Sequence, residues 1–311
     1  MTNLAIILLG QVRTFFTKHG CIEFLRVIDT SLNHYEKIYI SIVISGVFDK
    51  DKIDWFKLEL DKKNVFYNTI LFDVNDTDKL TQEKIKNREY LEIKSQYLKI
   101  NNYANKEILN IDDYLKKASY QFHQLSIGIK DIIEFENKNN IKFLCIMKTR
   151  FDIKYHNNFY PYVNESSRIE DKLLFNSHIK AIFKNKYHID ITSNAFLLDL
   201  KSKKIIHPNC RVREDHFSTS LGGAYLYNWA SLENIKNGDN NILYCFNDHV
   251  LFGKRDVFLK LNNLIYSYGI IRTDLNINHF YAEESQLLMF CIENKINPLM
   301  YLDKDIHDII R

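Results

Sequence analysis

Short apolar runs alternate with amphipathic segments along the first half of the chain. The run from Leu4 to Leu9 is continuous and ends at Gly10, as expected of a strand that is covered on both faces. Three later runs have the same character. The strands predicted in this way cover residues 4–9, 37–46, 65–73 and 142–147.

Segments with helical periodicity lie between these runs. The longest covers residues 112–140, where apolar residues recur every three or four positions from Leu115 to Ile132. Residues 74–108 are polar and lysine-rich, and we expect a mobile helical insert near the site entrance. The other predicted helices cover residues 14–33 and 53–64. This alternation of strand and helix predicts a parallel sheet with crossover helices.

The pattern becomes less regular beyond residue 153. Predicted strands cover residues 173–176, 194–200 and 249–253, and predicted helices cover residues 220–236, 254–267 and 283–294. With only 9 Gly and 3 Pro, no linker divides the chain. We therefore predict one α/β domain over residues 1–311, with a mainly parallel, Rossmann-like sheet flanked by helices. Its first half, residues 1–153, would bind a nucleotide, and its irregular, mixed half, residues 154–311, would shape a second substrate.

Composition narrows the range of functions. A formal charge of +3 is too small to indicate nucleic-acid binding, and no arginine-rich arm or zinc-finger spacing is present. The 5 cysteines are scattered without a CxxC pair, so neither structural zinc nor a disulfide framework is indicated, and a reducing cytoplasm fits. Basic runs such as Lys201–Lys204 are interpreted as solvated surface, with peripheral attachment to an anionic membrane as the alternative.

Candidate chemistry lies where the predicted strands end. In open α/β sheets, ligands bind beyond the carboxyl ends of the strands. The first strand ends in Gly10-Gln11-Val12-Arg13 and the fourth is followed by Thr149-Arg150-Phe151-Asp152. Arg13 is also predicted to open a helix, where backbone N–H groups favour an anion. Its guanidinium suits a phosphate, whereas the structural alternative is an ion pair with a neighbouring carboxylate.

Asp152 has three interpretations. It caps the backbone of its loop, it pairs with Arg150, or it binds a divalent cation that bridges a diphosphate. Carboxylate oxygen is what Mg²⁺ and Mn²⁺ require, and Mg²⁺ usually takes only one or two protein carboxylates besides phosphate oxygens.

Three segments together resemble a known enzyme family. "LLGQVRTF", "YQFHQLSIG" and "CIMKTRFDI" occur in an order and at a spacing similar to those of bacterial glycosyltransferases of the GT-A type, which build lipopolysaccharide and capsular polysaccharide. The resemblance implies a GT-A-like fold and a short acidic motif that holds the nucleotide-sugar diphosphate through a metal ion. That motif falls on Arg150-Phe151-Asp152, with arginine where the first aspartate would be. Either Asp152 alone contacts Mn²⁺ or Mg²⁺, or Arg150 supplies the positive charge and the metal is dispensable.

Further candidates are found on other segments. On the long helix, Gln121, Gln124 and Ser126 face the nucleotide or, alternatively, form a solvated polar face. Asp248, just before a short predicted strand, is the leading candidate for the general base that deprotonates the acceptor hydroxyl, or it caps the following turn. Glu283 and Glu284, at the start of a late predicted helix, are second-ranked candidates for the catalytic role. They rank lower because acidic residues in a first turn are common for another reason, their favourable interaction with the helix dipole.

The predicted function follows from these residues and the resemblance. We expect a cytoplasmic enzyme, acting also at the inner face of the cell membrane, that moves a sugar from a nucleotide-sugar donor to a capsule or lipopolysaccharide acceptor. Gly10, Gln11, Arg13, Gln121, Gln124, Arg150 and Asp152 would bind the donor. The alternatives are transfer of another nucleotide-activated group, sulfuryl or phosphoryl, and a non-catalytic glycan-binding protein.

Overall fold

The computed structural model of the chain describes residues 3–16, 20–85, 111–155, 161, 234–235, 237–246, 249–267, 287, 290–291, 293–301 and 307–309. Its centre is a seven-stranded sheet with the order β3-β2-β1-β4-β7-β6-β8, and β5 and β9 form a separate pair. The strands are β1 (Asn3–Gln11), β2 (Lys37–Ser45), β3 (Phe66–Phe72), β4 (Cys145–Arg150), β5 (Ile153–Tyr155), β6 (Ile242–Phe246), β7 (Val250–Lys254), β8 (Asn297–Tyr301) and β9 (His307–Ile309). The helices are α1 (Gly20–Leu32), α2 (Lys50–Lys62), α3 (Val74–Ile85), α5 (Ile111–Asn139), α10 (Arg255–Lys260) and α11 (Leu264–Ser267).

The sheet is mostly parallel, as predicted. Strands β3, β2, β1 and β4 run in one direction, β7 is antiparallel to β4, and β6 and β8 are parallel to each other and antiparallel to β7. The α/β class and the change from a parallel front half to a mixed back half are therefore confirmed. β1 has β2 as its neighbour on one side and β4 on the other, because the chain runs from β1 to β2 and β3 and then crosses back to β4.

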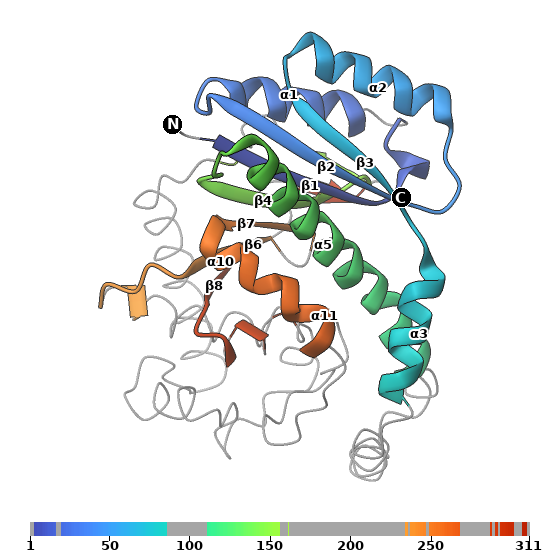
Figure 1. Cartoon of the computed structure of the whole chain (residues 1–311), viewed down its shortest axis with the longest axis vertical. Coiled ribbons are helices and arrows are strands. Elements are labelled where there is room, and N and C mark those ends of the chain that lie inside the picture. The colour runs from blue at the N-terminus through green and yellow to red at the C-terminus, as the bar shows by residue number, and fades with distance from the viewer. Residues whose placement is uncertain are drawn as a thin grey trace, which may run out of the picture.

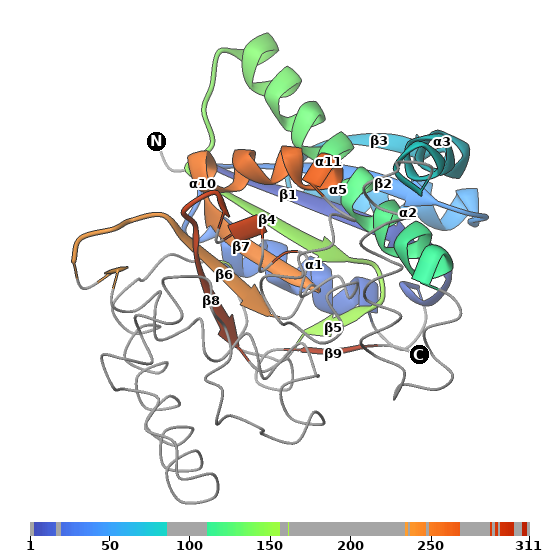
Figure 2. The same ribbon diagram turned by 90° about the horizontal axis from the view of Figure 1, so that it is seen from below.

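Helices cover both faces of the sheet (Figures 1 and 2). Alternate residues of β1 divide between two apolar clusters, which explains why its sequence is a continuous apolar run. Ala5, Ile7 and Leu9 pack with α5 and with α10 and α11. Leu4, Ile6 and Leu8 face the opposite cluster, which includes buried residues of α1 and α2. The sheet is thus the middle of three layers, with its strand ends free to carry a site.

The cysteines behave as core residues. Cys21, Cys145, Cys245 and Cys291 are free and buried. Burial raises the pKa of the Cys21 thiol to about 12, with a smaller contribution from the Glu59 carboxylate. A thiol in such surroundings stays protonated and unreactive at neutral pH.

The first predicted helix is wrong at its start. Residues Val12–Thr14 form a single 3₁₀ turn and α1 begins only at Gly20. Phe15 explains the difference: its ring is 1% exposed and packs against other core aromatic side chains, and its carbonyl oxygen accepts a bond from the Cys21 N–H at 2.7 Å. Tertiary packing of Phe15 therefore overrides the local helical periodicity. Arg13 does not lie at a helix N-terminus.

The fourth strand is also displaced, from the predicted residues 142–147 to Cys145–Arg150. The residues before it are bound elsewhere: the Phe143 N–H donates to Glu136 at 3.0 Å and the Leu144 N–H donates to the Asn3 carbonyl at 2.8 Å. Thr149 and Arg150 consequently belong to the strand itself.

The back half agrees with the prediction only in part. The predicted strand 249–253 is β7, and residues 287, 290, 291 and 293 are helical within the predicted helix 283–294. Strands β6, β8 and β9 were not predicted, because short strands carry little periodicity. The predicted helix 254–267 is α10 and α11 joined by a 3₁₀ turn at Leu261–Asn263. The predicted elements at 173–176, 194–200 and most of 220–236 lie outside the described residues.

Gly128 sets how closely α5 approaches the sheet. A Cβ atom at this position would meet Cγ2 of Ile7, a fully buried residue of β1, at 2.5 Å. Gly128→Ala gains about 1 kcal/mol of helix propensity, but overpacking a core costs about 1–3 kcal/mol. We expect urea denaturation to show a free energy of unfolding lowered by up to about 2 kcal/mol. In an Ile7→Ala background, which removes the clashing methyl group, the same change should not destabilise further; an increase in stability in the wild-type background would contradict this packing.

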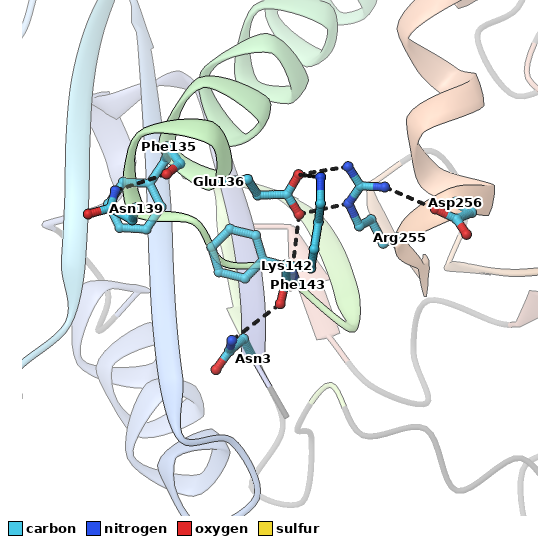
Figure 3. Close-up of polar contacts among 8 residues, drawn as sticks. All are labelled: Asn3, Phe135, Glu136, Asn139, Lys142, Phe143, Arg255 and Asp256. Carbon is cyan, nitrogen blue, oxygen red and sulfur yellow. Dashed lines mark hydrogen bonds and ion pairs between the residues drawn. The ribbon is translucent and has the colours of Figure 1, made fainter. Parts of the chain in front are cut away.

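A buried ion pair fastens the amino edge of the sheet (Figure 3). The Glu136 side chain, fully buried at the end of α5, accepts two bonds from Arg255, from Nε and Nη2, each at 2.7 Å. It also accepts the Phe143 N–H bond that precedes β4. Hydrogen bonding to Glu136 raises the pKa of Arg255. One carboxylate thus ties α5, β4 and α10 together at the end of the sheet opposite to the carboxyl ends of β1 and β4.

Candidate functional site

A cleft of about 510 Å³ opens at the carboxyl edge of the parallel strands. We call it the edge cleft. It is lined by Leu9, Gly10, Gln11, Arg13, Ser45, Gly46, Val74, Tyr120, Gln121, Gln124, Arg150 and Asp152. The predicted donor-binding residues, Gly10, Gln11, Arg13, Gln121, Gln124, Arg150 and Asp152, all lie in it. Its volume falls within the range of small-molecule and cofactor sites.

The edge cleft lies at the topological switch point of the sheet. The chain leaves β1 toward β2 on one side and returns to β4 on the other, so the carboxyl ends of β1 and β4 lie side by side there. Leu9 of β1 is paired in register with Arg150 of β4, and Gln11 is paired with Ser45 of β2. Open α/β sheets bind their ligands in the crevice at this point.

Arg13 supplies an available positive charge. It follows β1 within the turn Val12–Thr14, and its side chain is exposed. Among the described residues it has no ion-pair or hydrogen-bond partner, so the predicted alternative of a structural ion pair is not observed. A guanidinium that lines a cleft without a protein partner can bind an anion.

Arg150 and Asp152 form a bidentate pair. Arg150 donates from Nε to Oδ1 of Asp152 at 2.9 Å and from Nη2 to Oδ2 at 2.6 Å. Of the three interpretations of Asp152, pairing with Arg150 is the one observed. The carboxylate fixes the plane of the guanidinium, which is an orienting role.

Phe151 explains the spacing of this pair. Its side chain is fully buried while the residues on either side of it line the edge cleft. Its ring meets that of Phe15 edge to face, with the centroids 5.1 Å apart. Phe15 comes two residues after Arg13, so one aromatic contact couples the turn that carries Arg13 to the end of β4, where Arg150 and Asp152 lie on either side of Phe151. Such a contact contributes about 0.5–1.5 kcal/mol beyond area burial.

On the opposite side of the edge cleft, the described lining residues are uncharged. Ser45 is the last residue of β2 and Gly46 comes directly after it, Val74 begins α3, and Tyr120 lies on α5. The Tyr120 hydroxyl donates to Asp78 at 2.7 Å, and burial together with this bond raises its pKa to about 12, so the phenol is neutral at pH 7. Residues of α3 and α5 thus form an uncharged wall, and the predicted insert near the site entrance is helical over Val74–Ile85.

Sequence reasoning missed Ser45, Gly46, Val74 and Tyr120 as lining residues. The rule that selected Arg13 and Arg150 would have selected Ser45 and Gly46 too, since the predicted second strand ends there; the backbone of Gly46, at φ 76°, turns sharply at that point. Val74 and Tyr120 reach the edge cleft through the packing of α3 on α5, which no local pattern indicates. Ser126 is not among the residues that line the edge cleft, and its hydroxyl donates to Asn262 at 2.8 Å.

The described residues do not fit a metal centre built by the protein alone. No group of three or more His, Cys, Asp or Glu side chains is gathered among them. Both oxygens of Asp152 accept bonds from Arg150, whose positive charge also opposes a cation at that carboxylate. No step of the chemistry is therefore derived through Mn²⁺ or Mg²⁺.

The predicted acceptor-side residues Asp248, Glu283 and Glu284 lie outside the described residues. The residues that flank the first of them are informative. Phe246 of β6 and Val250 of β7 are paired, and Leu251 of β7 is paired with Lys148 of the antiparallel strand β4. Neighbouring strands are about 4.8 Å apart. The paired ends of β6 and β7 therefore lie at the same edge of the sheet as Arg150, and the role of Asp248 stays a prediction.

Comparisons of the chain with models of known protein families, with curated proteins and with solved structures found no match. Within the described part of the chain, no helix combines the length and the apolar character that crossing a bilayer requires.

Proposed function

We propose that the chain is a glycosyltransferase of the GT-A type that transfers a sugar from a nucleotide-sugar donor to a surface glycan. One observation carries the proposal: residues predicted from separate segments to bind the donor line a single cleft at the switch point of a mostly parallel sheet. Two of them, Arg13 and Arg150, are arginines. The capsule or lipopolysaccharide acceptor comes from the family resemblance.

In the proposed reaction, Arg13 and Arg150 bind the diphosphate of the donor. An acceptor hydroxyl oxygen forms a bond to the anomeric carbon while the bond from that carbon to the diphosphate oxygen breaks, and the electron pair leaves with the diphosphate. The guanidinium groups stabilise the negative charge that develops there, and fixed donors in a cleft do so without reorganising. Asp152 acts as a positioning residue by holding the guanidinium plane of Arg150.

The proton of the acceptor hydroxyl needs a base if the reaction inverts the anomeric centre. Asp248 is proposed for this role, because Phe246 and Val250 on either side of it in the sequence are paired at the edge of the sheet that carries Arg150. Glu283 and Glu284 rank second. A retaining reaction would not need this base. Because arginine supplies the positive charge that binds the diphosphate, Mn²⁺ or Mg²⁺ would add to this charge but would not be required for it.

Thermal denaturation with candidate ligands tests the proposal. UDP-, GDP- and CMP-sugars should be compared, each with and without Mn²⁺, and one class should raise the midpoint temperature, because a ligand that binds only the folded state stabilises it. Transfer to a glycan acceptor then tests the activity. Stabilisation by 3′-phosphoadenosine 5′-phosphosulfate alone would instead favour sulfuryl transfer. Glycan binding with no nucleotide effect would favour a non-catalytic glycan-binding protein.

A further inference from the structure

Two polar side chains in the edge cleft lack hydrogen-bond partners. Gln124 is 4% exposed and Ser45 is 7% exposed, and both line the cleft. The Oε1 atom of Gln124 is buried with no partner. Nothing in the described part of the chain hydrogen-bonds the Ser45 side chain. Gln124 thus presents a buried acceptor without a protein partner beside an open volume, and Ser45 adds a hydroxyl to the same cleft.

Such groups are costly to a fold. A buried polar atom without a partner costs about 1–3 kcal/mol, and an apolar side chain of the same shape would avoid this cost. Elsewhere on the same helix the requirement is met. Ser126, two residues further on, donates to Asn262, and Asp131 accepts from Tyr39 at 2.6 Å and from Asn68 at 2.7 Å. The unsatisfied Oε1 atom of Gln124 therefore points to a partner that is not part of the protein.

The positions of these groups identify which part of a ligand they meet. Ser45 ends β2 on the face that packs against α5, since Tyr39 and Val43 of the same strand belong to that cluster. Gln124 lies one turn of α5 from Gly128, which contacts β1, so it stands over the end of β1. The positive charges, Arg13 and Arg150, come from the loop after β1 and from β4 instead. Ser45 and Gln124 thus belong to the uncharged side of the cleft.

We propose that Gln124 and Ser45 are specificity-determining residues that hydrogen-bond the polar edge of a nucleobase. This inference rests on the proposed function, in which the phosphates of the same nucleotide bind Arg13 and Arg150. A primary amide presents a donor and an acceptor side by side, which complements a base edge that presents one of each. A hydroxyl donates or accepts as the base requires. The unpaired amide then lowers the stability of the ligand-free protein, because the base-recognition site is already formed before the base binds.

Replacement of Gln124 by leucine gives a two-part test. We expect Gln124→Leu to raise the midpoint temperature of the ligand-free protein by about 1–3 °C, because an apolar side chain removes the unsatisfied amide. Isothermal titration with UDP, GDP, CDP and ADP should show that the same variant binds the best nucleotide about tenfold more weakly and discriminates poorly between bases. Ser45→Ala, a smaller change, should also weaken base discrimination.

Ser126→Ala is the matched control, because it removes a satisfied polar group from the same helix outside the edge cleft. It should lower the midpoint temperature and leave nucleotide affinities unchanged. If the wild-type protein binds a nucleotide and both Gln124→Leu and Ser45→Ala keep its affinity and base preference, the inference is wrong while the proposed function stands. If the wild-type protein binds no nucleotide, the proposed function fails and the inference fails with it. A less stable ligand-free Gln124→Leu protein would show that Gln124 is structural.

Discussion

Arg150→Met is expected to weaken nucleotide-diphosphate binding by at least about 100-fold. A hydrogen bond to a charged group is worth about 1.5–3 kcal/mol, and the planar guanidinium can make two of them. The substitution also leaves the Asp152 carboxylate in the edge cleft without its partner, where it repels the incoming phosphates. Titration calorimetry with the best nucleotide of the thermal screen would measure the loss.

The partner substitution separates these two effects. Asp152→Asn should keep the fold and the nucleotide affinity but lose most of the transfer activity, since the amide holds the Arg150 guanidinium through one acceptor instead of two. Arg150→Met combined with Asp152→Asn should bind better than Arg150→Met alone, because the exposed negative charge is gone. Lys62→Met is the control: Lys62 pairs with Glu59 at 2.6 Å on α2, outside the cleft. Equal nucleotide affinity in wild type and Arg150→Met would contradict the assigned role.

Glu136→Leu is expected to lower the free energy of unfolding by about 3–5 kcal/mol. The substitution leaves the Arg255 guanidinium and the Phe143 N–H without the acceptor that both share, and the Glu136 side chain is fully buried. Urea denaturation followed by circular dichroism would measure the change. Glu136→Gln, which keeps one acceptor oxygen, should cost less and serves if the leucine variant does not fold.

Two further variants test the origin of this effect. Glu136→Leu combined with Arg255→Met should recover part of the stability, because two apolar side chains leave no buried charge unpaired. Lys142→Met should change stability by less than about 1 kcal/mol, since Lys142 is 66% exposed and lies 3.7 Å from the Glu136 carboxylate. A loss below about 1 kcal/mol for Glu136→Leu would show that water replaces the pair.

The sequence revealed the front half of the fold because its strands are buried on both faces. Continuous apolar runs such as Leu4–Leu9 are difficult to mistake, and α5 has the periodicity of a long amphipathic helix. The rule that ligands bind beyond the carboxyl ends of the strands also predicts that Arg13 and Arg150 lie at one edge of the sheet. The predictions that failed depend on distant contacts. Phe15 packs against Phe151 and so delays the start of the expected helix, and the short strands β6 and β8 are defined only by their pairing with neighbouring strands.

The chemistry of the site was only partly accessible in the same way. The Arg150-Phe151-Asp152 spacing permitted pairing, capping and metal binding alike, and choosing among them required the side-chain geometry. Predicting the uncharged wall requires the tertiary structure, because Tyr120 and Val74 line the edge cleft only through the packing of α3 on α5. The unsatisfied Gln124 amide has no sequence signature, since it is defined by the absence of a partner.

A crystal structure with the nucleotide diphosphate bound is the most direct test of the site. The account predicts phosphate oxygens within about 3 Å of the guanidinium nitrogens of Arg13 and Arg150, with the base on the side of Ser45 and Gln124. A nucleotide bound elsewhere, with residues 10–13 and 150–152 packed away from it, would contradict the account.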